Sequence, residues 1–151
     1  MPIRPARDAD RDALLLLWER SVRATHAFLA EADIDFYRPL VREALGSDAL
    51  EVWVLATEAD EPMGFLGLEG NRIEALFLAP EHRGAGGGRR LVEHAQALHG
   101  GELRLDVNEQ NGGARGFYEA LGFEVVGRSE LDGTGRPYPL LQMRRTPPEG
   151  T

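Results

Sequence analysis

A glycine-rich run in the middle of the chain is the first candidate for a chemical site. Residues 83–90 read Arg-Gly-Ala-Gly-Gly-Gly-Arg-Arg, between an apolar stretch that ends at Pro80 and a helical stretch that begins at Leu91. A glycine-rich turn between a strand and a helix exposes successive backbone N–H groups, and the helix dipole favours an anion there. The run therefore predicts a site for an anionic, phosphate-bearing ligand.

The spelling of this run excludes two common nucleotide-binding motifs. A Walker A motif ends in Gly-Lys-Ser/Thr, whereas this run ends in Gly88-Arg89-Arg90. A dinucleotide-binding fingerprint that starts at Gly84 needs a sixth-position glycine, where this chain has Arg89. The run does match the pattern R-x-x-G-x-G, from Arg83 through Gly86 to Gly88.

A second motif follows further along the chain. Asn111 is followed by Phe117-Tyr118 and Gly122-Phe123, in the pattern N-x6-Y-x3-G-F. Together, and in this order, the two motifs resemble those of the GCN5-related N-acetyltransferases (GNAT), and the resemblance spans essentially the whole chain. The segments 24–26, 107–111, 127–132 and 137–141 are similar to those of the YjaB-like bacterial subgroup of that family.

The resemblance implies that the chain binds acetyl-coenzyme A (acetyl-CoA). The anionic part of the cofactor is expected on the backbone N–H groups of the glycine run. The pantetheine arm is expected to pair with the backbone of residues 76–78 like an added strand. The expected cofactor-binding residues are Leu76, Phe77, Leu78, Arg83, Gly84, Ala85, Gly86, Gly87, Gly88, Arg89, Asn111 and Phe117.

Acetyl transfer to an amine needs a base for the amine and an acid for the departing thiolate. The resemblance makes Tyr118 the acid, because a phenol with a pKa of about 10 stays protonated at pH 7. Glu74 is the first candidate for the base, and strand alternation puts it on one face with Leu76 and Leu78. Asp106 is the rival base. The resemblance also implies that the backbone N–H of Leu76 lies near the thioester oxygen.

The resemblance places the acceptor pocket between the first two helices and the last hairpin. The pool of acidic, aromatic and imidazole side chains there is His26, Phe28, Glu31, Asp33, Asp35, Phe36, Tyr37, Asp132 and Tyr138. From this pool we select His26, Phe28, Tyr37, Asp132 and Tyr138, with His26 as a candidate pocket base. Such side chains suit a cationic amine, although a solvated acidic face explains the acids as well. The acceptor is expected to be a protein lysine, a protein N-terminus or a small cationic amine.

These residues require a mixed α/β framework. Apolar patterning predicts strands at 3–6, 51–57, 63–69, 72–78, 103–107, 123–128 and 137–144. Helices are predicted from Asp8 or Asp10 to about 26–29, and over 31–45, 91–98 and 114–121. The expected fold is the GNAT fold, one mixed and mostly antiparallel sheet of six to seven strands with about four helices, ordered β-α-α-β-β-β-α-β-α-β-β. The N-acetyltransferase domain is expected over 1–145, and a flexible C-terminal tail over 146–151.

Composition narrows the class of protein further. The 151 residues carry a formal net charge of −8, contain no cysteine and take every basic charge from arginine. The missing cysteine excludes disulfides, thiolate zinc sites and a cysteinyl intermediate, so we expect direct transfer to the amine. Four scattered histidines predict no metal site, and the acidic balance argues against nucleic-acid binding. With no membrane span and no signal-peptide core, a cytoplasmic bacterial protein is expected.

Two classes of function remain. One is an acetyl-CoA-dependent N-acetyltransferase that moves an acetyl group directly to a primary amine. The other is a non-catalytic module on the same fold that binds acetyl-CoA or a partner. Because binding alone requires neither Tyr118 nor Glu74, their presence favours the enzyme. The sequence leaves the oligomeric state open, with a homodimer as one option.

Overall fold

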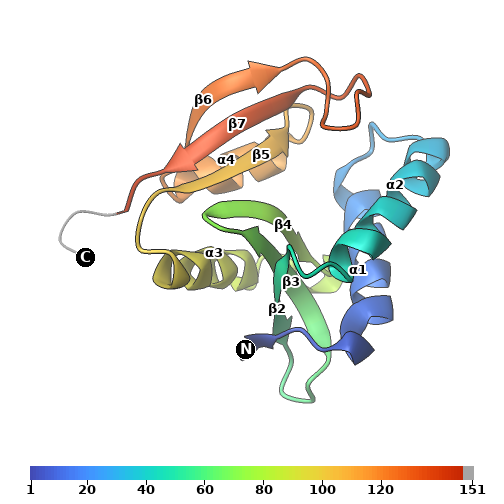
Figure 1. Cartoon of the computed structure of the whole chain (residues 1–151), viewed down its shortest axis with the longest axis vertical. Helices are drawn as coiled ribbons and strands as arrows, with labels where there is room; N and C mark the ends of the chain where they lie inside the picture. The colour runs from blue at the N-terminus through green and yellow to red at the C-terminus, as the bar shows by residue number, and fades with distance from the viewer. Residues whose placement is uncertain (148–151) are drawn as a thin grey trace.

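Seven strands form a single mixed sheet in the computed structural model, which describes residues 1–147 (Figure 1). They are β1 (Ile3–Pro5), β2 (Glu51–Ala56), β3 (Pro62–Glu69), β4 (Arg72–Leu78), β5 (Leu103–Asn108), β6 (Glu124–Ser129) and β7 (Leu140–Arg145). Their spatial order is β1-β2-β3-β4-β5-β7-β6, with β4 and β5 parallel and the other neighbours antiparallel. The expected fold is confirmed. Of the predicted tail 146–151, residues 148–151 lie outside the described residues.

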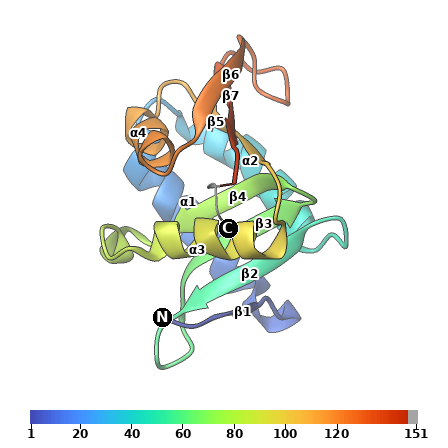
Figure 2. The ribbon, with the colours of Figure 1, turned by 90° about the vertical axis from the view of Figure 1, so that its left-hand side faces the viewer.

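Four helices cover the two faces of the sheet. They are α1 (Arg11–Thr25), α2 (Glu31–Leu45), α3 (Gly87–Leu98) and α4 (Gly112–Ala120), joined by the short 3-10 turns η1 (Asp8–Asp10) and η2 (Pro80–His82). Figure 2 shows α3 in front of the sheet and α1 behind it. Each face has its own apolar core, and the interior strand β3 supplies both, with Leu66 and Leu68 in one and Phe65 in the other. No helix within residues 1–147 is long and apolar enough to cross a membrane.

Several element boundaries shift by one or two residues from the sequence prediction, and two shift further. The helix predicted over 91–98 begins earlier, at Gly87, so the end of the glycine run forms its first turn. The strand predicted over 137–144 begins only at Leu140. Pro137 and Pro139 have no backbone N–H to donate, which explains why regular pairing starts after them.

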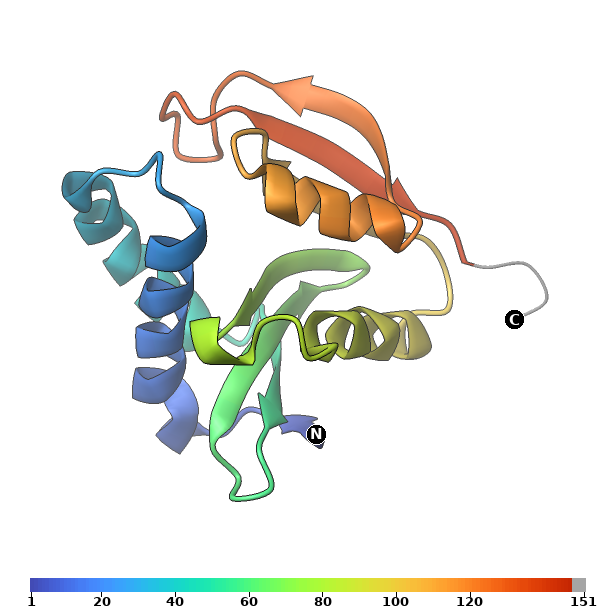
Figure 3. The ribbon, with the colours of Figure 1, turned by 180° about the vertical axis from the view of Figure 1, so that it is seen from behind.

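The parallel strands β4 and β5 pair over a short distance and then separate. Their register covers two residue pairs, Arg72 with Arg104 and Ile73 with Leu105. Figures 1 and 3 show the two halves of the sheet diverging beyond this point, with α4 beside the upper half and α3 beside the lower half. The divergence leaves the C-terminal end of β4 without a strand partner on its β5 side.

The backbone orientation of β4 follows from its pairing with β3. Ala79 donates its N–H to the Met63 carbonyl, toward β3. Because N–H groups alternate along an antiparallel strand, those of Leu76 and Leu78 point away from β3 and into the gap. The N–H groups of Leu76 and Leu78 therefore line the gap, where they can pair with an added strand as the sequence analysis predicts.

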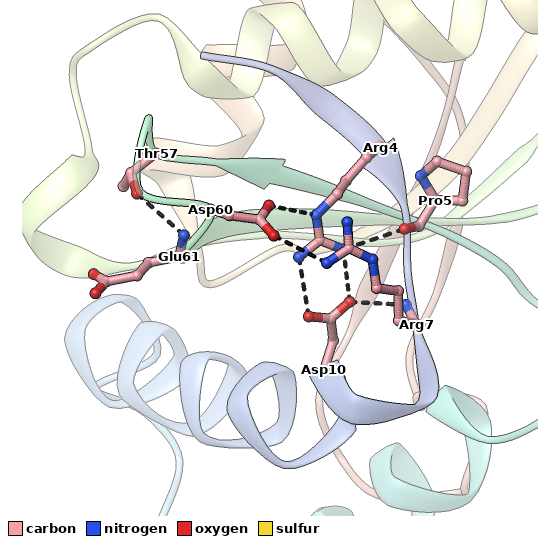
Figure 4. A network of polar contacts seen from close by, with 7 residues as sticks. All are labelled: Arg4, Pro5, Arg7, Asp10, Thr57, Asp60 and Glu61. Atoms are coloured by element: carbon pink, nitrogen blue, oxygen red, sulfur yellow. Dashed lines mark hydrogen bonds and ion pairs between the residues drawn. The ribbon is translucent and has the colours of Figure 1, made fainter.

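A cluster of polar contacts fixes the start of α1 against the sheet (Figure 4). The Arg4 guanidinium donates to both carboxylate oxygens of Asp10, at 2.8 and 3.0 Å, and to Asp60 in the β2–β3 turn, at 2.7 Å. Asp10 also accepts the backbone N–H of Arg7 at 2.8 Å. The hydrogen bond from Arg4 lowers the pKa of Asp10, so this carboxylate is ionised at neutral pH.

Candidate active site

A cavity of about 320 Å³ lies where the glycine run meets the end of β4 and the start of α4. Every predicted cofactor-binding residue except Ala85 lines it. It is lined in addition by Ser21, Thr25, His26, Gly113, Ala114 and Tyr118. We refer to this space as the cofactor cavity.

The backbone of the glycine run has the conformation of an anion site. Gly84 and Gly86 have φ of +83° and +84°, which L side chains rarely adopt. The first hydrogen bond of α3 runs from the Arg90 N–H to the Gly86 carbonyl, at 3.1 Å. The three preceding N–H groups, of residues 87–89, consequently have no acceptor in the helix and are free for a ligand.

A close contact between α3 and α4 explains the glycine at position 88. A Cβ atom on Gly88 would lie 2.9 Å from Cζ of Phe117, which is closer than real Cβ contacts. The absence of a side chain lets the Phe117 ring close against the first turn of α3. The two sequence motifs, far apart in the chain, therefore meet through this pair.

The charge around the loop is more positive than the local sequence indicates. The two nearby acids are bound by distant arginines, Glu81 by Arg20 at 2.5 Å and Glu93 by Arg145 at 3.0 Å. Within residues 1–147, the loop arginines make no ion pair, and they are Arg83, Arg89 and Arg90. The observed backbone and charge fit the phosphate groups of a coenzyme A ligand.

Tyr118 lies inside α4 with its ring almost fully buried. Its ring packs edge-on against Phe117, at 5.1 Å between centroids, and Phe123, at 5.4 Å. Burial raises the pKa of the Tyr118 phenol, which keeps it protonated over the physiological range. The residue lines both the cofactor cavity and the adjoining cavity described next.

A smaller space of about 220 Å³, here called the junction cavity, lies between β4 and β5. It is lined by His26, Tyr118, Asn111, Asn108 and both predicted bases, Glu74 and Asp106, together with neighbouring residues of β4, β5 and α4. The gap between the strands thus brings the predicted acid and both predicted bases to one place.

The two predicted bases share one arginine. Nε of Arg72 lies 2.7 Å from Oε1 of Glu74, and its NH2 group donates to Oδ2 of Asp106. The other Asp106 oxygen, Oδ1, is buried and has no partner within residues 1–147. Glu74 retains 36% of its side-chain exposure and is therefore open to solvent.

A β-bulge changes the position of Glu74 from the one that alternation predicts. Gly67 pairs with Ala75 and Leu68 pairs with Ile73, so Glu74 is an extra residue on β4. As a result Ile73 joins the same core as Leu76 and Leu78, and Glu74 lines a groove on the α1 and α2 side. The expected shared face with Leu76 and Leu78 is wrong, because a bulge reverses the alternation of a strand.

Asn111 has a structural role that its motif did not reveal. Its side-chain Oδ1 accepts the backbone N–H of Ala114 at 3.1 Å and caps the start of α4. The residue also lines the cofactor and junction cavities. The cap fixes the side-chain oxygen and leaves the amide N–H groups for a ligand.

A third space of about 280 Å³, the acceptor cavity, lies between α1, α2 and the β6–β7 loop. It contains His26, Tyr37, Asp132 and Tyr138 of the predicted substrate pocket. Phe28 is outside this lining and packs its ring against His26, at 5.3 Å, and Tyr138, at 5.8 Å. The sequence did not predict the apolar part of the cavity wall. That part is formed by Trp18, Val22, Leu29, Val41, Phe77 and Leu140.

The acids around the acceptor cavity are bound within the protein. Asp33 accepts hydrogen bonds from Tyr138 and from Arg136, the latter at 3.0 Å, and the bond from Tyr138 lowers the pKa of Asp33. Asp132 accepts the Tyr37 hydroxyl. Arg136 also lies 3.8 Å from the centroid of the Phe36 ring. These contacts tie α2 to the β6–β7 loop, and the acids consequently act as internal partners.

Known proteins resemble both the sequence and the fold of this chain. Residues 48–125 match the family model "Acetyltransferase (GNAT) domain". A peptidyl-lysine N-acetyltransferase YjaB from Salmonella typhimurium is 49% identical over 144 residues, which cover 93% of this chain and 95% of that protein. The chain belongs to the GNAT acetyltransferase family.

Solved GNAT structures agree with the fold described above. The solution structure of apo-form YjaB from Escherichia coli superimposes with a TM-score of 0.89 and 44% sequence identity, over 97% of this chain and 98% of that one. The PaiA N-acetyltransferase of Thermoplasma acidophilum, solved in complex with coenzyme A, shares the fold at a TM-score of 0.74 and 21% identity, over 97% and 99% of the two chains. This GNAT protein is an N-acetyltransferase that uses acetyl-CoA and transfers the acetyl group to an amine.

Proposed function

We propose that the acceptor of this N-acetyltransferase is the ε-amine of a lysine in a protein. The proposal is supported by the names of the relatives, since two YjaB proteins, 49% and 47% identical, are called peptidyl-lysine N-acetyltransferases. It is also supported by the apolar wall of the acceptor cavity, because the four methylene groups of a lysine pack well on such a surface. The acids that would attract a free polyamine are already bound to Arg136 and two tyrosines.

The observation that carries this proposal is the meeting of three spaces at the β4–β5 gap. The cofactor cavity and the junction cavity share Leu76 and Tyr118, and the acceptor cavity shares Phe77 with both. A thioester entering from one side and an amine entering from the other would come together between the strands. Acetyl-CoA supplies the activated acetyl group at this point.

The loop and β4 give the protein its hold on the cofactor. The N–H groups at the start of α3 and the arginines 83, 89 and 90, which make no ion pair in the described part of the chain, suit the phosphates. The inward N–H groups of Leu76 and Leu78 suit the amide groups of the pantetheine arm. In this arrangement the N–H of Leu76 donates to the thioester oxygen and stabilises the negative charge that develops there.

Glu74 takes the proton from the acceptor amine in this proposal, directly or through one water. It lines the junction cavity, and its exposure gives the proton a way out to solvent. Asp106 is the rival, since it lines the same cavity and carries a buried oxygen without a partner in residues 1–147. Tyr118 donates its phenolic proton to the departing thiolate.

Thiol release measured across a panel of amines tests the proposed acceptor. The panel contains a lysine peptide with a blocked N-terminus, its lysine-to-glutamine version, a lysine-free peptide with a free N-terminus, and spermidine. We expect the blocked lysine peptide to react with the highest kcat/KM and its glutamine version to be inactive. Faster reaction with spermidine, or with the free N-terminus, would overturn the lysine assignment.

The same assay separates the two candidate bases. Glu74→Gln is expected to lower kcat by about 10²-fold at pH 7, and less at high pH where more of the amine is already neutral. Asp106→Asn, which keeps a hydrogen-bonding group near Arg72, is expected to cost much less. The reverse order of the two losses would give the base role to Asp106.

A further inference from the structure

His26 occupies a position that no sequence motif of the cofactor site explains. It follows the last residue of α1 and lines the cofactor cavity, the junction cavity and the acceptor cavity. Within residues 1–147, only His26 and Phe77 border all three cavities. Phe77 offers only an apolar ring, so His26 is the polar side chain at the point where they meet.

The proton on the His26 ring can be located from two hydrogen bonds of Thr25. Oγ1 of Thr25 donates to the Ser21 carbonyl at 2.8 Å and lies 2.7 Å from Nδ1 of His26. A hydroxyl has a single hydrogen, and the Ser21 carbonyl can only accept one. Both contacts are hydrogen bonds at the same time only when Nδ1 of His26 is the donor. This geometry therefore favours the Nδ1–H tautomer of His26, with a lone pair on Nε2.

The Nε2 atom of His26 is not a buried atom without a partner, although its ring lines the cavities. Within residues 1–147, the histidine nitrogens that are buried without a partner are Nε2 of His94 and Nε2 of His99. Nε2 of His26 is not among them, and the hydrogen bond of this ring is made by Nδ1. The neighbouring Phe28 ring limits the rotation of the imidazole, at 5.3 Å between centroids.

We propose that Nε2 of His26 accepts a hydrogen bond from the acceptor amine and positions its nitrogen in the junction cavity. The inference rests on the proposed function, because it needs an amine that enters from the acceptor cavity. It assigns His26 a task separate from proton removal, which stays with the carboxylate. Thr25 acts through His26 and is a positioning residue.

The electrostatic state of the ring agrees with this role. Burial lowers the pKa of His26 to about 4, so the ring is neutral at pH 7. A neutral imidazole accepts a hydrogen bond from an amine or an ammonium group, whereas a charged one would repel the ammonium form. Proton removal stays with Glu74, because its exposed side chain can pass the proton on to solvent.

Steady-state kinetics with the blocked lysine peptide provide the first test. We expect His26→Ala and Thr25→Val to lower kcat/KM for the peptide, by about tenfold or more for His26→Ala and less for Thr25→Val. Acetyl-CoA affinity, measured by calorimetry, should change much less than the peptide kcat/KM, although both residues also border the cofactor cavity. Thr25→Ser keeps the hydroxyl and should recover most of the activity that Thr25→Val loses. Wild-type peptide kinetics for His26→Ala would overturn the proposal.

The tautomer itself can be measured by ¹⁵N NMR of the labelled wild-type protein, a readout that does not depend on activity. We expect Nδ1 of His26 to carry the proton at pH 7, and Thr25→Val to mix the two tautomers. A wild-type Nε2–H tautomer would overturn the inference. Failure of the proposed function gives a different result, which is faster thiol release by the wild type with spermidine or with the free N-terminus than with the blocked lysine peptide. Thermal melting of each variant checks that it folds.

Discussion

Tyr118 combines a buried ring with a hydroxyl at the edge of two cavities. The edge-on contacts with Phe117 and Phe123 hold the ring, and burial keeps the phenol protonated. Tyr118→Phe removes only the hydroxyl and preserves these contacts. We expect kcat to fall by roughly 10²-fold or more while the affinity for acetyl-CoA and the melting temperature stay close to wild type.

Thiol release and calorimetry on the same preparation check this expectation. Single-turnover measurements show whether the chemical step limits the rate of the wild type, which the interpretation of kcat requires. If the chemical step is limiting and kcat is unchanged in Tyr118→Phe, Tyr118 is not the acid.

Among the elements, the first turn of α3 connects the cofactor loop to α4. A Cβ on Gly88 would lie 2.9 Å from the Phe117 ring, so Gly88→Ala must displace either that ring or the first turn of α3. We expect the affinity for acetyl-CoA to fall by about tenfold or more, because the free N–H groups move with the turn. Gly100→Ala is the matched control, since a Cβ there meets nothing within 4 Å. Equal affinities for the two variants would contradict this account.

The sequence predicted elements well where the pattern is local. Apolar alternation and helical spacing placed all seven strands and four helices, and the residues that the two motifs predict for the cofactor line one cavity, apart from Ala85. The bulge at Glu74 could not be predicted, because it depends on how β4 registers with β3. The pairing of Asp33 with Arg136, 103 residues away, was equally invisible to any local pattern. Asp33 and Asp132, which the sequence indicated as part of an acceptor surface, are therefore hydrogen-bonded to other residues of the protein.

The apolar wall of the acceptor cavity was missed for a related reason. Trp18 and Val22 recur at helical spacing with the core residues of α1, and both are buried. A side chain that lines a cavity and one that fills a core give the same periodic signal. Only the placement of α2 and the β6–β7 loop shows that these residues border a space.

At the scale of the whole molecule, the polar cluster in Figure 4 is expected to contribute to stability. Asp10 is 9% exposed and holds Arg4 and the Arg7 backbone. We expect Asp10→Asn to lower the free energy of unfolding by about 2–3 kcal/mol, because Arg4 loses the partly buried one of its two carboxylate partners and keeps only Asp60. Asp8→Asn, at an exposed carboxylate paired with Arg11, should change it by less than about 0.5 kcal/mol. Urea unfolding measures both, and similar losses would contradict the expectation.

A pH dependence of stability follows from the half-buried His26. Its pKa is about 4 in the folded state and about 6.5 when exposed, so the unfolded chain binds the extra proton between these values. This contribution is present above pH 7 and is lost as the pH falls from about 6.5 to 4. The titratable and charged groups around its cavities are Arg83, Arg89, Glu74, Asp106, Tyr118, Tyr37, Asp132 and Tyr138.

We therefore compare the wild type with His26→Gln, which retains the other titrating groups. Between pH 7 and pH 5 the wild type is expected to lose about 2 kcal/mol more of its free energy of unfolding than the variant. Urea titrations at the two pH values measure the difference. An equal loss in both proteins would show that the folded-state pKa of His26 is not depressed.

The short pairing of β4 with β5 has a consequence for motion. Two residue pairs join the halves of the sheet, so the strands beyond them are held together mainly by the core beneath. A ligand that bridges the two edges adds the missing cross-link and acts as part of the sheet. Saturation with coenzyme A should then slow amide hydrogen exchange at Leu76 and Leu78, on one edge, together with Asp106 and Asn108, on the other. Binding of the cofactor therefore also couples the movements of the two halves of the sheet.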